Sequence, residues 1–144
     1  MRAKLAESDA ELERIVPVLL QLRSHFDERS VIERIKVQQE GGYRIAYVES
    51  DGEVLCVAGF VLGYKLAWGK HVYVDDLITD ENRRSSGAGR CMIDWLKSYA
   101  REHGCEQLHL DSGVTRFAAH KFYLREGFRI SSHHLAITDL NAEQ

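Results

Sequence analysis

The segment Arg84-Ser85-Ser86-Gly87-Ala88-Gly89-Arg90 combines small residues with two arginines. It follows a β-branched and aromatic stretch at 71–79 and precedes apolar residues at helical spacing, so it is expected to join a strand to a helix. Small residues let main-chain amides approach an anion, and the first turn of a helix offers amides and the positive end of its dipole. Arg84 and Arg90 would add charge-assisted hydrogen bonds. The segment predicts a pyrophosphate-binding turn, and the alternative is a glycine-rich helix cap without a ligand.

Two consecutive carboxylates, Asp75 and Asp76, lie in the preceding strand. A carboxylate beside another in a cleft has a raised pKa and attracts a cation, which suits a general base and an anchor for an amine. Successive strand residues point to opposite faces, so only one should enter the cleft unless a bulge intervenes. The alternative is a solvated carboxylate that caps the chain or pairs with Arg83 or Arg84.

The cysteines and histidines favour neither a metal nor a covalent intermediate. Cys56, Cys91 and Cys105 are odd in number and lack CxxC spacing, which argues against a disulfide framework or a zinc site. The neighbours His133 and His134 would diverge on a strand, so no metal is expected. His120, one helical turn before Tyr123, remains a minor candidate for a base or relay.

The surrounding pattern predicts an α/β domain over residues 1–144. Ser8 and Glu11 have the spacing of a capping box at a helix start, and Pro17 is expected to bend or break that helix. Asp51-Gly52 signals a hairpin. The expected elements are a strand at 4–6, helices after 8 and at 30–39, strands at 43–49, 54–66 and 71–79, a helix from 88, a strand at 107–111, a helix at 115–126, and strands at 128–130 and 135–138.

Composition narrows the class of protein. The chain has 144 residues, a net charge of −3 and one proline, which suits one globular domain and argues against a general nucleic-acid binder. The charged N-terminus is unlike a signal peptide, and no apolar run approaches the ~20 residues that span a bilayer. A cytoplasmic protein without a membrane partner is expected. The oligomeric state stays open, a homodimer included.

Two motifs together resemble the GNAT superfamily of N-acetyltransferases. Arg84, Gly87 and Gly89 match its pyrophosphate motif [Q/R]xxGx[G/A], and the stretch AHKFYLREGF is similar to its A-xxx-Y-xxx-GF signature. The resemblance implies an α/β (α+β) GNAT fold, in which a central mixed, mostly antiparallel sheet of six to seven strands is flanked by about four helices. The chain departs from many members at Arg116, where they carry an asparagine.

The resemblance also implies roles for single residues. Tyr123, which by spacing alone would be a core residue, becomes the general acid near the sulfur; its reference pKa of ~10 leaves it a proton to donate. Asp75 becomes the favoured base, and Asp76, Phe26 and Asp27 lie on the acceptor side. An amide near Leu77 would stabilise the oxyanion. The cofactor-binding set is Leu77, Ile78, Thr79, Arg84, Ser85, Ser86, Gly87, Ala88, Gly89, Arg90, Arg116 and Ala119.

The function predicted on this basis is acetyl transfer from acetyl-CoA, without a metal, to an amine by direct attack in a ternary complex. The acidic pair weakly favours a cationic acceptor, either a small-molecule amine or a lysine side chain of a peptide. The alternative is a noncatalytic acyl-CoA sensor or subunit, in which Tyr123 and Asp75 would be dispensable. A nucleic-acid-binding domain is disfavoured by the charge balance.

Overall fold

A five-stranded mixed sheet organises the chain as far as Leu110. Neighbouring strands are antiparallel from the first to the fourth, and the fifth runs parallel to the fourth. This confirms the predicted fold class, with fewer strands than expected. The strands, in spatial order, are β1 (Arg2–Leu5), β2 (Arg44–Ser50), β3 (Glu53–Lys65), β4 (Gly69–Thr79) and β5 (Gln107–Leu110).

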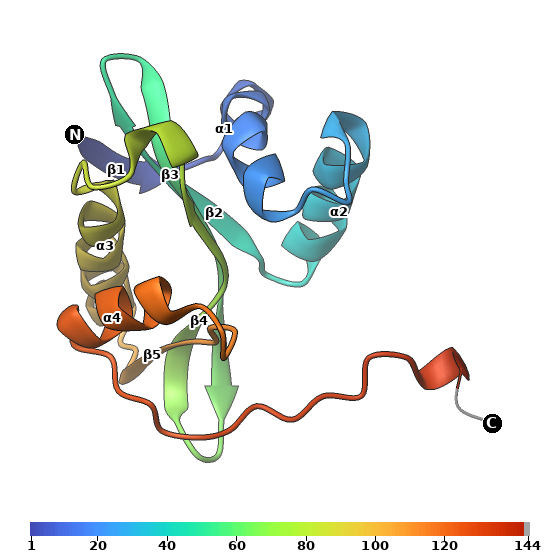
Figure 1. Cartoon of the computed structure of the whole chain (residues 1–144), viewed down its shortest axis with the longest axis vertical. Helices are drawn as coiled ribbons and strands as arrows, with labels where there is room; N and C mark the ends of the chain where they lie inside the picture. The colour runs from blue at the N-terminus through green and yellow to red at the C-terminus, as the bar shows by residue number, and fades with distance from the viewer. Residues whose placement is uncertain (143–144) are drawn as a thin grey trace. The chain divides into compact units, whose positions relative to one another are not determined.

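The computed structural model describes residues 1–142 (Figure 1). The chain divides into two compact units, Met1–Leu110 and a second that begins at Asp111. Each unit is described by itself.

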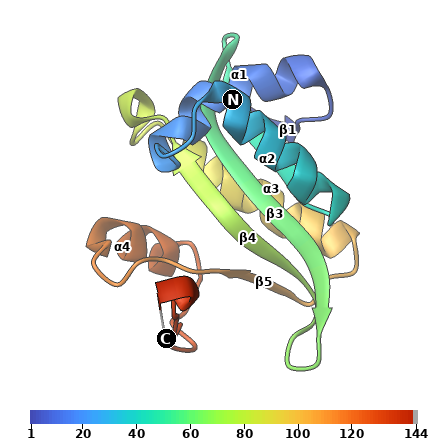
Figure 2. The same cartoon turned by 90° about the vertical axis from the view of Figure 1, so that its right-hand side faces the viewer.

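Three helices cover the two faces of the sheet in the first unit. Figures 1 and 2 show α1 (Asp9–Leu22) and α2 (Glu28–Glu40) on one face and α3 (Ala88–Glu102) on the other. The first face buries apolar residues of α1 and α2 against the strand residues Ile45, Tyr47 and Val57. On the second face the Phe60 ring packs edge-on against the aromatic rings of α3. The result is a three-layer arrangement with one core on each side of the sheet.

Side-chain caps start α1 and α2. Ser8 accepts a hydrogen bond from the Glu11 amide, and the Glu11 side chain accepts from the Ser8 amide, which confirms the predicted capping box. Asp27 and Ser30 form the same reciprocal pair at the start of α2.

Pro17 was predicted to bend or break the first helix, and the break does not occur, because α1 continues through it to Leu22. An interior proline costs about 3 kcal/mol. Neighbouring side chains, among them Val16, Val18 and Leu19, are buried against the core. Burial of each such side chain contributes roughly 1.5–3 kcal/mol, so packing outweighs the lost hydrogen bond.

The hairpin between β2 and β3 forms where it is predicted. Asp51 and Gly52 have φ angles of 52° and 78°. Two consecutive positive φ values match the right-handed twist of the flanking strands, which is why an Asp-Gly pair suits this turn.

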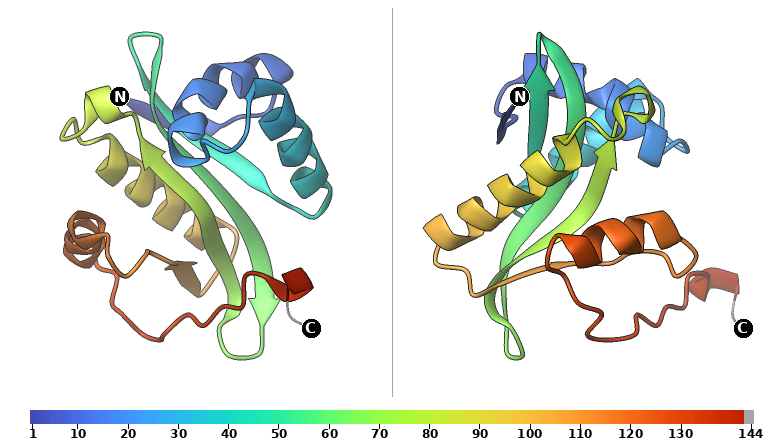
Figure 3. Two further views of the ribbon diagram at one scale, coloured as in Figure 1. Left: turned by 45° about the vertical axis from the view of Figure 1, so that its right-hand side comes forward. Right: turned by 60° about the vertical axis from the view of Figure 1, so that its left-hand side comes forward.

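The second unit contains α4 (Phe117–Arg125) and a short 3-10 helix, η2 (Leu140–Ala142). The predicted strands at 128–130 and 135–138 are wrong, since residues 128–139 contain no strand within the described chain (Figure 3). Their apolar residues Ile130, Leu135 and Ile137 are exposed. A strand needs a paired neighbour, and two short runs interrupted by Ser131–His134 do not pair with each other.

Among residues 1–142 we find no helix with the length and hydropathy that crossing a membrane requires.

Candidate active site

A β-bulge in β4 brings the two predicted carboxylates to one face of the sheet. On β3, Phe60 pairs with Val74 and Gly59 pairs with Asp76, so Asp75 is the extra residue. Phe60 packs against α3, which puts Val74 on the α3 face and Asp76 on the opposite face. Residues at a bulge escape the strict alternation of a strand. Asp75 and Asp76 therefore both lie on the side covered by α1 and α2.

Asp76 is held by side chains from two other elements. Its Oδ1 accepts a hydrogen bond from Nε of Arg23, the C-cap residue of α1, at 2.8 Å. Its Oδ2 accepts from the Tyr43 hydroxyl at 2.5 Å. Burial, and next the charge of Asp76, raises the pKa of Tyr43 far above its usual range, so this phenol stays protonated and donates. The Asp76 side chain is only 13% exposed.

Asp75 differs from its neighbour in its environment. Within residues 1–142 its carboxylate makes no side-chain hydrogen bond or salt bridge, although its carbonyl oxygen accepts from Nη2 of Arg23 at 3.1 Å. Asp75 as a residue is exposed, yet nearby protein atoms partly desolvate its carboxyl group. This burial raises the pKa of Asp75, the charge of Asp76 raises it further, and Arg23 acts in the opposite direction. The arrangement provides a carboxylate with increased affinity for a proton.

The end of β4 that contains Leu77, Ile78 and Thr79 has a neighbouring strand on one side only. β5 pairs with β4 from His71 to Val74 and no further within the sheet of the described residues. β3 continues to pair with β4 as far as Thr79. Within the described sheet, the edge of β4 that faces away from β3 therefore has no neighbouring strand after Val74.

The predicted pyrophosphate turn is exposed and leads directly into α3. Gly87 is the N-cap residue with φ of 87° and has no side chain to accept from a first-turn amide, whereas the hydroxyl of Ser86 accepts a long hydrogen bond from the Ala88 amide at 3.4 Å. Ser85 also has a positive φ, 64°. All residues from Arg84 to Gly87 are exposed, whereas Ala88 is buried. α3 thus begins without the N-cap side-chain acceptor that serves both α1 and α2.

The start of this turn is anchored to the rest of the first unit. The 3-10 helix η1 (Glu81–Arg83) follows Asp80, and the Gln21 side chain of α1 contacts both of these segments. It accepts from the Glu81 amide at 3.0 Å and donates to the Asp80 carboxylate at 3.3 Å. Arg83 pairs with Glu53 of β3 and with neither aspartate of the bulge.

The predicted acceptor-side residues Phe26 and Asp27 lie between α1 and α2. Phe26 packs against the core, and the guanidinium carbon of Arg34 lies 5.6 Å from its ring centroid. The Asp27 carboxylate caps α2, and hydrogen bonds from Ser30 lower its pKa. Asp27 therefore has a structural role as the cap of α2, and its place on the acceptor side stays a prediction.

The remaining predicted residues lie in the second unit. Arg116 precedes α4, and Ala119 and Tyr123 are within it. The Tyr123 ring contacts the ring of Phe128, with centroids 5.7 Å apart. The structure thus brings Asp75 and Asp76 together in one unit and places the predicted acid in the other.

Three residues at the bulge were missed by sequence reasoning: Arg23, Tyr43 and Gly59. An added Cβ on Gly59 would overlap the hydroxyl and ring of Tyr43, so the glycine lets the phenol reach Asp76. These residues come from α1, the start of β2 and β3, and their joint position depends on strand register and helix packing. Gly59 inside a strand pattern was the one local signal available.

Cysteine and metal chemistry have little support. Burial raises the pKa of Cys56 to about 12 and also raises the pKa of Cys91, so both thiols stay protonated near neutral pH. Among residues 1–142 no group of three or more His, Cys, Asp or Glu side chains is placed to hold a metal.

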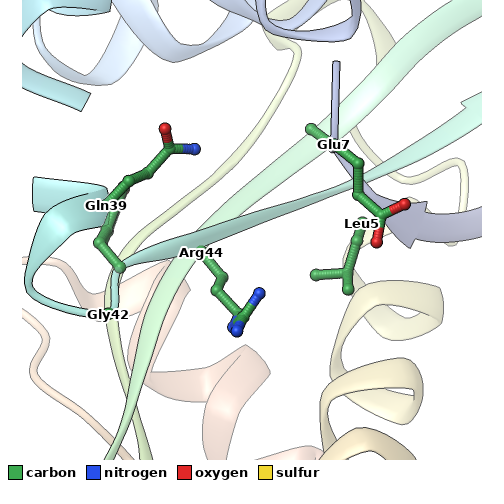
Figure 4. A pocket seen from close by; sticks show the side chains of 7 residues that line it. Leu5, Glu7, Gln39, Gly42 and Arg44 are labelled. Carbon is green, nitrogen blue, oxygen red and sulfur yellow. The ribbon is translucent and has the colours of Figure 1, made fainter. Parts of the chain in front are cut away.

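A separate cavity of about 410 Å³ lies where β1 ends and β2 begins (Figure 4). Its residues include Glu7, Gln39 and Arg44, which Figure 4 shows coming from different elements. None of the predicted site residues lines this cavity. The full lining is Leu5, Ala6, Glu7, Gln39, Gly42, Tyr43 and Arg44.

Comparison with known proteins gives similar sequences and similar folds. The chain is 30% identical over 120 residues to an uncharacterized N-acetyltransferase, YhdJ, of Bacillus subtilis, covering 81% of this chain and 84% of that protein. It is 29% identical over 90 residues to the aminoalkylphosphonate N-acetyltransferase of Salmonella typhimurium, covering 62% and 57% respectively. The solved structure of AAC(6')-Iy with the bisubstrate analogue CoA-S-monomethyl-acetylneamine has a TM-score of 0.78 at 14% identity, covering 96% of this chain and 98% of that one.

The family model described as Acetyltransferase (GNAT) family matches residues 11–128. This range includes the bulge in β4, the turn before α3 and the tyrosine of α4. The chain therefore belongs to the GNAT family of acetyltransferases.

Proposed function

We propose that this protein is an acetyl-CoA-dependent N-acetyltransferase that acts by direct attack of an amine in a ternary complex. The observation that carries the proposal is the start of α3, where an exposed left-handed glycine stands at the N-cap and supplies no side-chain acceptor to the first turn. The first-turn amides of such a helix suit the diphosphate of CoA. Family membership and a neighbouring fold solved with a CoA analogue support this choice.

The residues that would hold the cofactor follow one another along the chain. Amides from Ser85 to Arg90 would bind the diphosphate, with Arg84 and Arg90 as cationic partners. Leu77, Ile78 and Thr79 would pair their backbone with the pantetheine arm, which suits an edge of β4 that no strand of the described sheet occupies. We add two residues of the second unit, Ala119 because it begins the A-xxx-Y-xxx-GF motif, and Arg116 because it stands where many family members carry an asparagine and its guanidinium would suit a phosphate.

The reaction takes two protons from the acceptor nitrogen and adds one to the sulfur. Acetyl-CoA supplies the activated acetyl group as a thioester. The acceptor is mostly an ammonium ion at neutral pH, so Asp75 would take its first proton, directly or through water, before the nitrogen forms the new bond. As the carbon–sulfur bond breaks, Tyr123 would give its proton to the sulfur, and the second proton, which the nitrogen loses as the amide forms, would restore the Tyr123 phenol through water. The Leu77 amide would stabilise the oxyanion.

The acceptor is proposed to be a cationic amine. Asp75, Asp76 and Arg23 together carry a formal charge of −1 at the bulge, which attracts an ammonium group. Asp76, Phe26 and Asp27 would lie on the acceptor side. The names of the relatives include an aminoalkylphosphonate enzyme, and the bisubstrate analogue contains acetylneamine, so amine acceptors occur among proteins similar to this one.

An acetyl-CoA-dependent thiol-release assay tests the proposal against aminoalkylphosphonates, aminoglycosides, polyamines and lysine peptides. We expect turnover with at least one amine. Asp75→Asn and Tyr123→Phe should each lower kcat/KM about 10²–10⁴-fold, the usual contribution of a general base or acid. Arg29→Gln, on the exposed face of α2, is the control and should leave kcat/KM unchanged. Intact CoA binding without turnover on any amine would instead favour a sensor, and full activity in both variants would contradict the assigned roles.

A further inference from the structure

The bulge in β4 is clamped from two sides by residues that do not belong to its strand. Arg23 donates through Nε to the Asp76 carboxylate at 2.8 Å and through Nη2 to the Asp75 carbonyl oxygen at 3.1 Å. One guanidinium group therefore fixes two consecutive residues. A planar fork of donors is suited to such a two-point contact, whereas a lysine ammonium is not.

Tyr43, the residue immediately before β2, completes the clamp. Its hydroxyl donates to the second oxygen of Asp76 at 2.5 Å, and its ring is buried. The ring lies over Gly59, the residue that pairs with Asp76 across the sheet. Any side chain at position 59 would occupy the space of the phenol. The register of three strands thus creates the contact.

Arg23 and Tyr43 donate hydrogen bonds to the side chain of Asp76 but not to that of Asp75. Both carboxylate oxygens of Asp76 accept hydrogen bonds, and its side chain is 13% exposed. The Asp75 side chain receives no such donor within residues 1–142 and is accessible to solvent. We infer that Arg23 and Tyr43 are positioning residues, which fix Asp76 and the Asp75 backbone so that the Asp75 carboxylate remains unpaired beside a second, immobile carboxylate.

The charges of the clamp act on Asp75 with opposite signs. The groups that face Asp75 are Asp76 on its own strand, Arg23 at the end of α1 and Tyr43 immediately before β2. Apart from burial, the negative charge of Asp76 raises the pKa of Asp75 and the positive charge of Arg23 lowers it. Because the inference rests on the proposed role of Asp75 as the base, its test needs a readout that does not depend on turnover.

The experiment measures the pKa of Asp75 by a carboxyl carbon NMR titration in the full chain. Asp76→Asn removes the negative charge and should lower this pKa, whereas Arg23→Gln removes the positive charge and should raise it. We expect opposite shifts of roughly 0.5–1 pH unit, because solvent reduces the effect of a neighbouring charge on an exposed group. Arg23→Lys keeps the charge and should return the pKa most of the way to the wild-type value. Arg29→Gln removes an exposed charge of α2 that pairs with Glu33 and should leave the pKa of Asp75 unchanged.

Shifts of the same sign in Asp76→Asn and Arg23→Gln, or no shift, would overturn the inference. Tyr43→Phe provides a further check that keeps the ring over Gly59 and removes only the donor. It should broaden or split the Asp76 carboxyl signal while the amide spectrum stays folded, and an unchanged Asp76 signal would likewise count against the clamp. The acid limb of the pH profile of kcat/KM tests separately whether Asp75 is the general base. If the Asp75 pKa moves as expected and the acid limb does not follow, Asp75 is not the base although the positioning holds.

Discussion

At the scale of single residues, the chemistry depends on how two adjacent carboxylates come to differ. Asp76 is partly buried and accepts two hydrogen bonds, whereas Asp75 is exposed and its pKa is raised by partial desolvation and by the charge of Asp76. A raised pKa makes a carboxylate a better general base, because its affinity for a proton is then closer to that of the amine from which it takes the proton. The same feature makes ionised Asp75 unfavourable for the folded state.

The cost of ionising Asp75 in the folded state gives a prediction for the stability of Asp75→Asn. The folded-state pKa of Asp75 lies above the unfolded value of about 3.9, so the folded protein binds more protons in that window and its stability falls as pH rises through it. The variant removes this penalty. Its free energy of unfolding should equal that of wild type at low pH and exceed it at neutral pH, by less than about 1 kcal/mol because the site is solvated. Urea unfolding at several pH values measures this. A gain that is equal at all pH values, or a loss at neutral pH, would contradict the environment described for Asp75.

At the scale of elements, hydrogen-bonded side chains fix where α1 lies against the sheet. Glu11, in the first turn of α1, accepts from the Tyr47 hydroxyl of β2 at 2.6 Å and pairs with Lys4 of β1 at 3.3 Å. At the other end of α1, Gln21 contacts the turn before α3 and Arg23 contacts the bulge. The helix thus links the candidate base to the candidate cofactor turn.

Removal of the Glu11 charge should lower the free energy of unfolding by an amount that depends on pH. The hydrogen bond from Tyr47, followed by those from Glu7, Lys4 and Ser8, lowers the pKa of Glu11 to about 2. A lowered pKa stabilises the fold above the unfolded value of about 4.3, and this contribution is lost as pH falls through about 2. Glu11→Gln should therefore lower the free energy of unfolding at neutral pH, by about 1 kcal/mol because Glu11 lies near the surface and solvent weakens the effect of its partners. The difference from wild type should vanish near pH 2 in acid-unfolding experiments, and a constant difference would show that the pKa is not lowered.

The sequence predicted the elements well where the signal is local. The capping box at Ser8, the Asp51-Gly52 hairpin and the strand before the glycine-rich turn each depend on neighbours in the chain, and each forms. The continuation of α1 through Pro17 was not predicted, because burial against the sheet outweighs the local penalty. The Arg23, Tyr43 and Gly59 contacts depend on long-range register, which no local pattern contains.

At the scale of the whole molecule, the predicted site residues fall in two compact units. The first unit contains the bulge and the turn before α3, and the second contains α4 with Tyr123. The GNAT assignment came from two short motifs, 84–89 and 119–128, and the family match over residues 11–128 confirms it. The acceptor could not be predicted from the sequence. Phe26 packs against the core and Asp27 caps α2, and neither of these structural roles depends on which amine is the acceptor.

The central claim is that the start of α3 binds the diphosphate of CoA, and an amide NMR titration of the full chain with CoA tests it most directly. We predict that the largest shifts occur from Ser85 to Arg90. Gly87→Ala, which adds a Cβ into open space at a φ of 87°, should weaken binding about 5–30-fold through backbone strain of ~1–2 kcal/mol, whereas Ser85→Gly should not weaken it. Saturating CoA that leaves these amides unshifted, or an unchanged affinity in Gly87→Ala, would contradict the account.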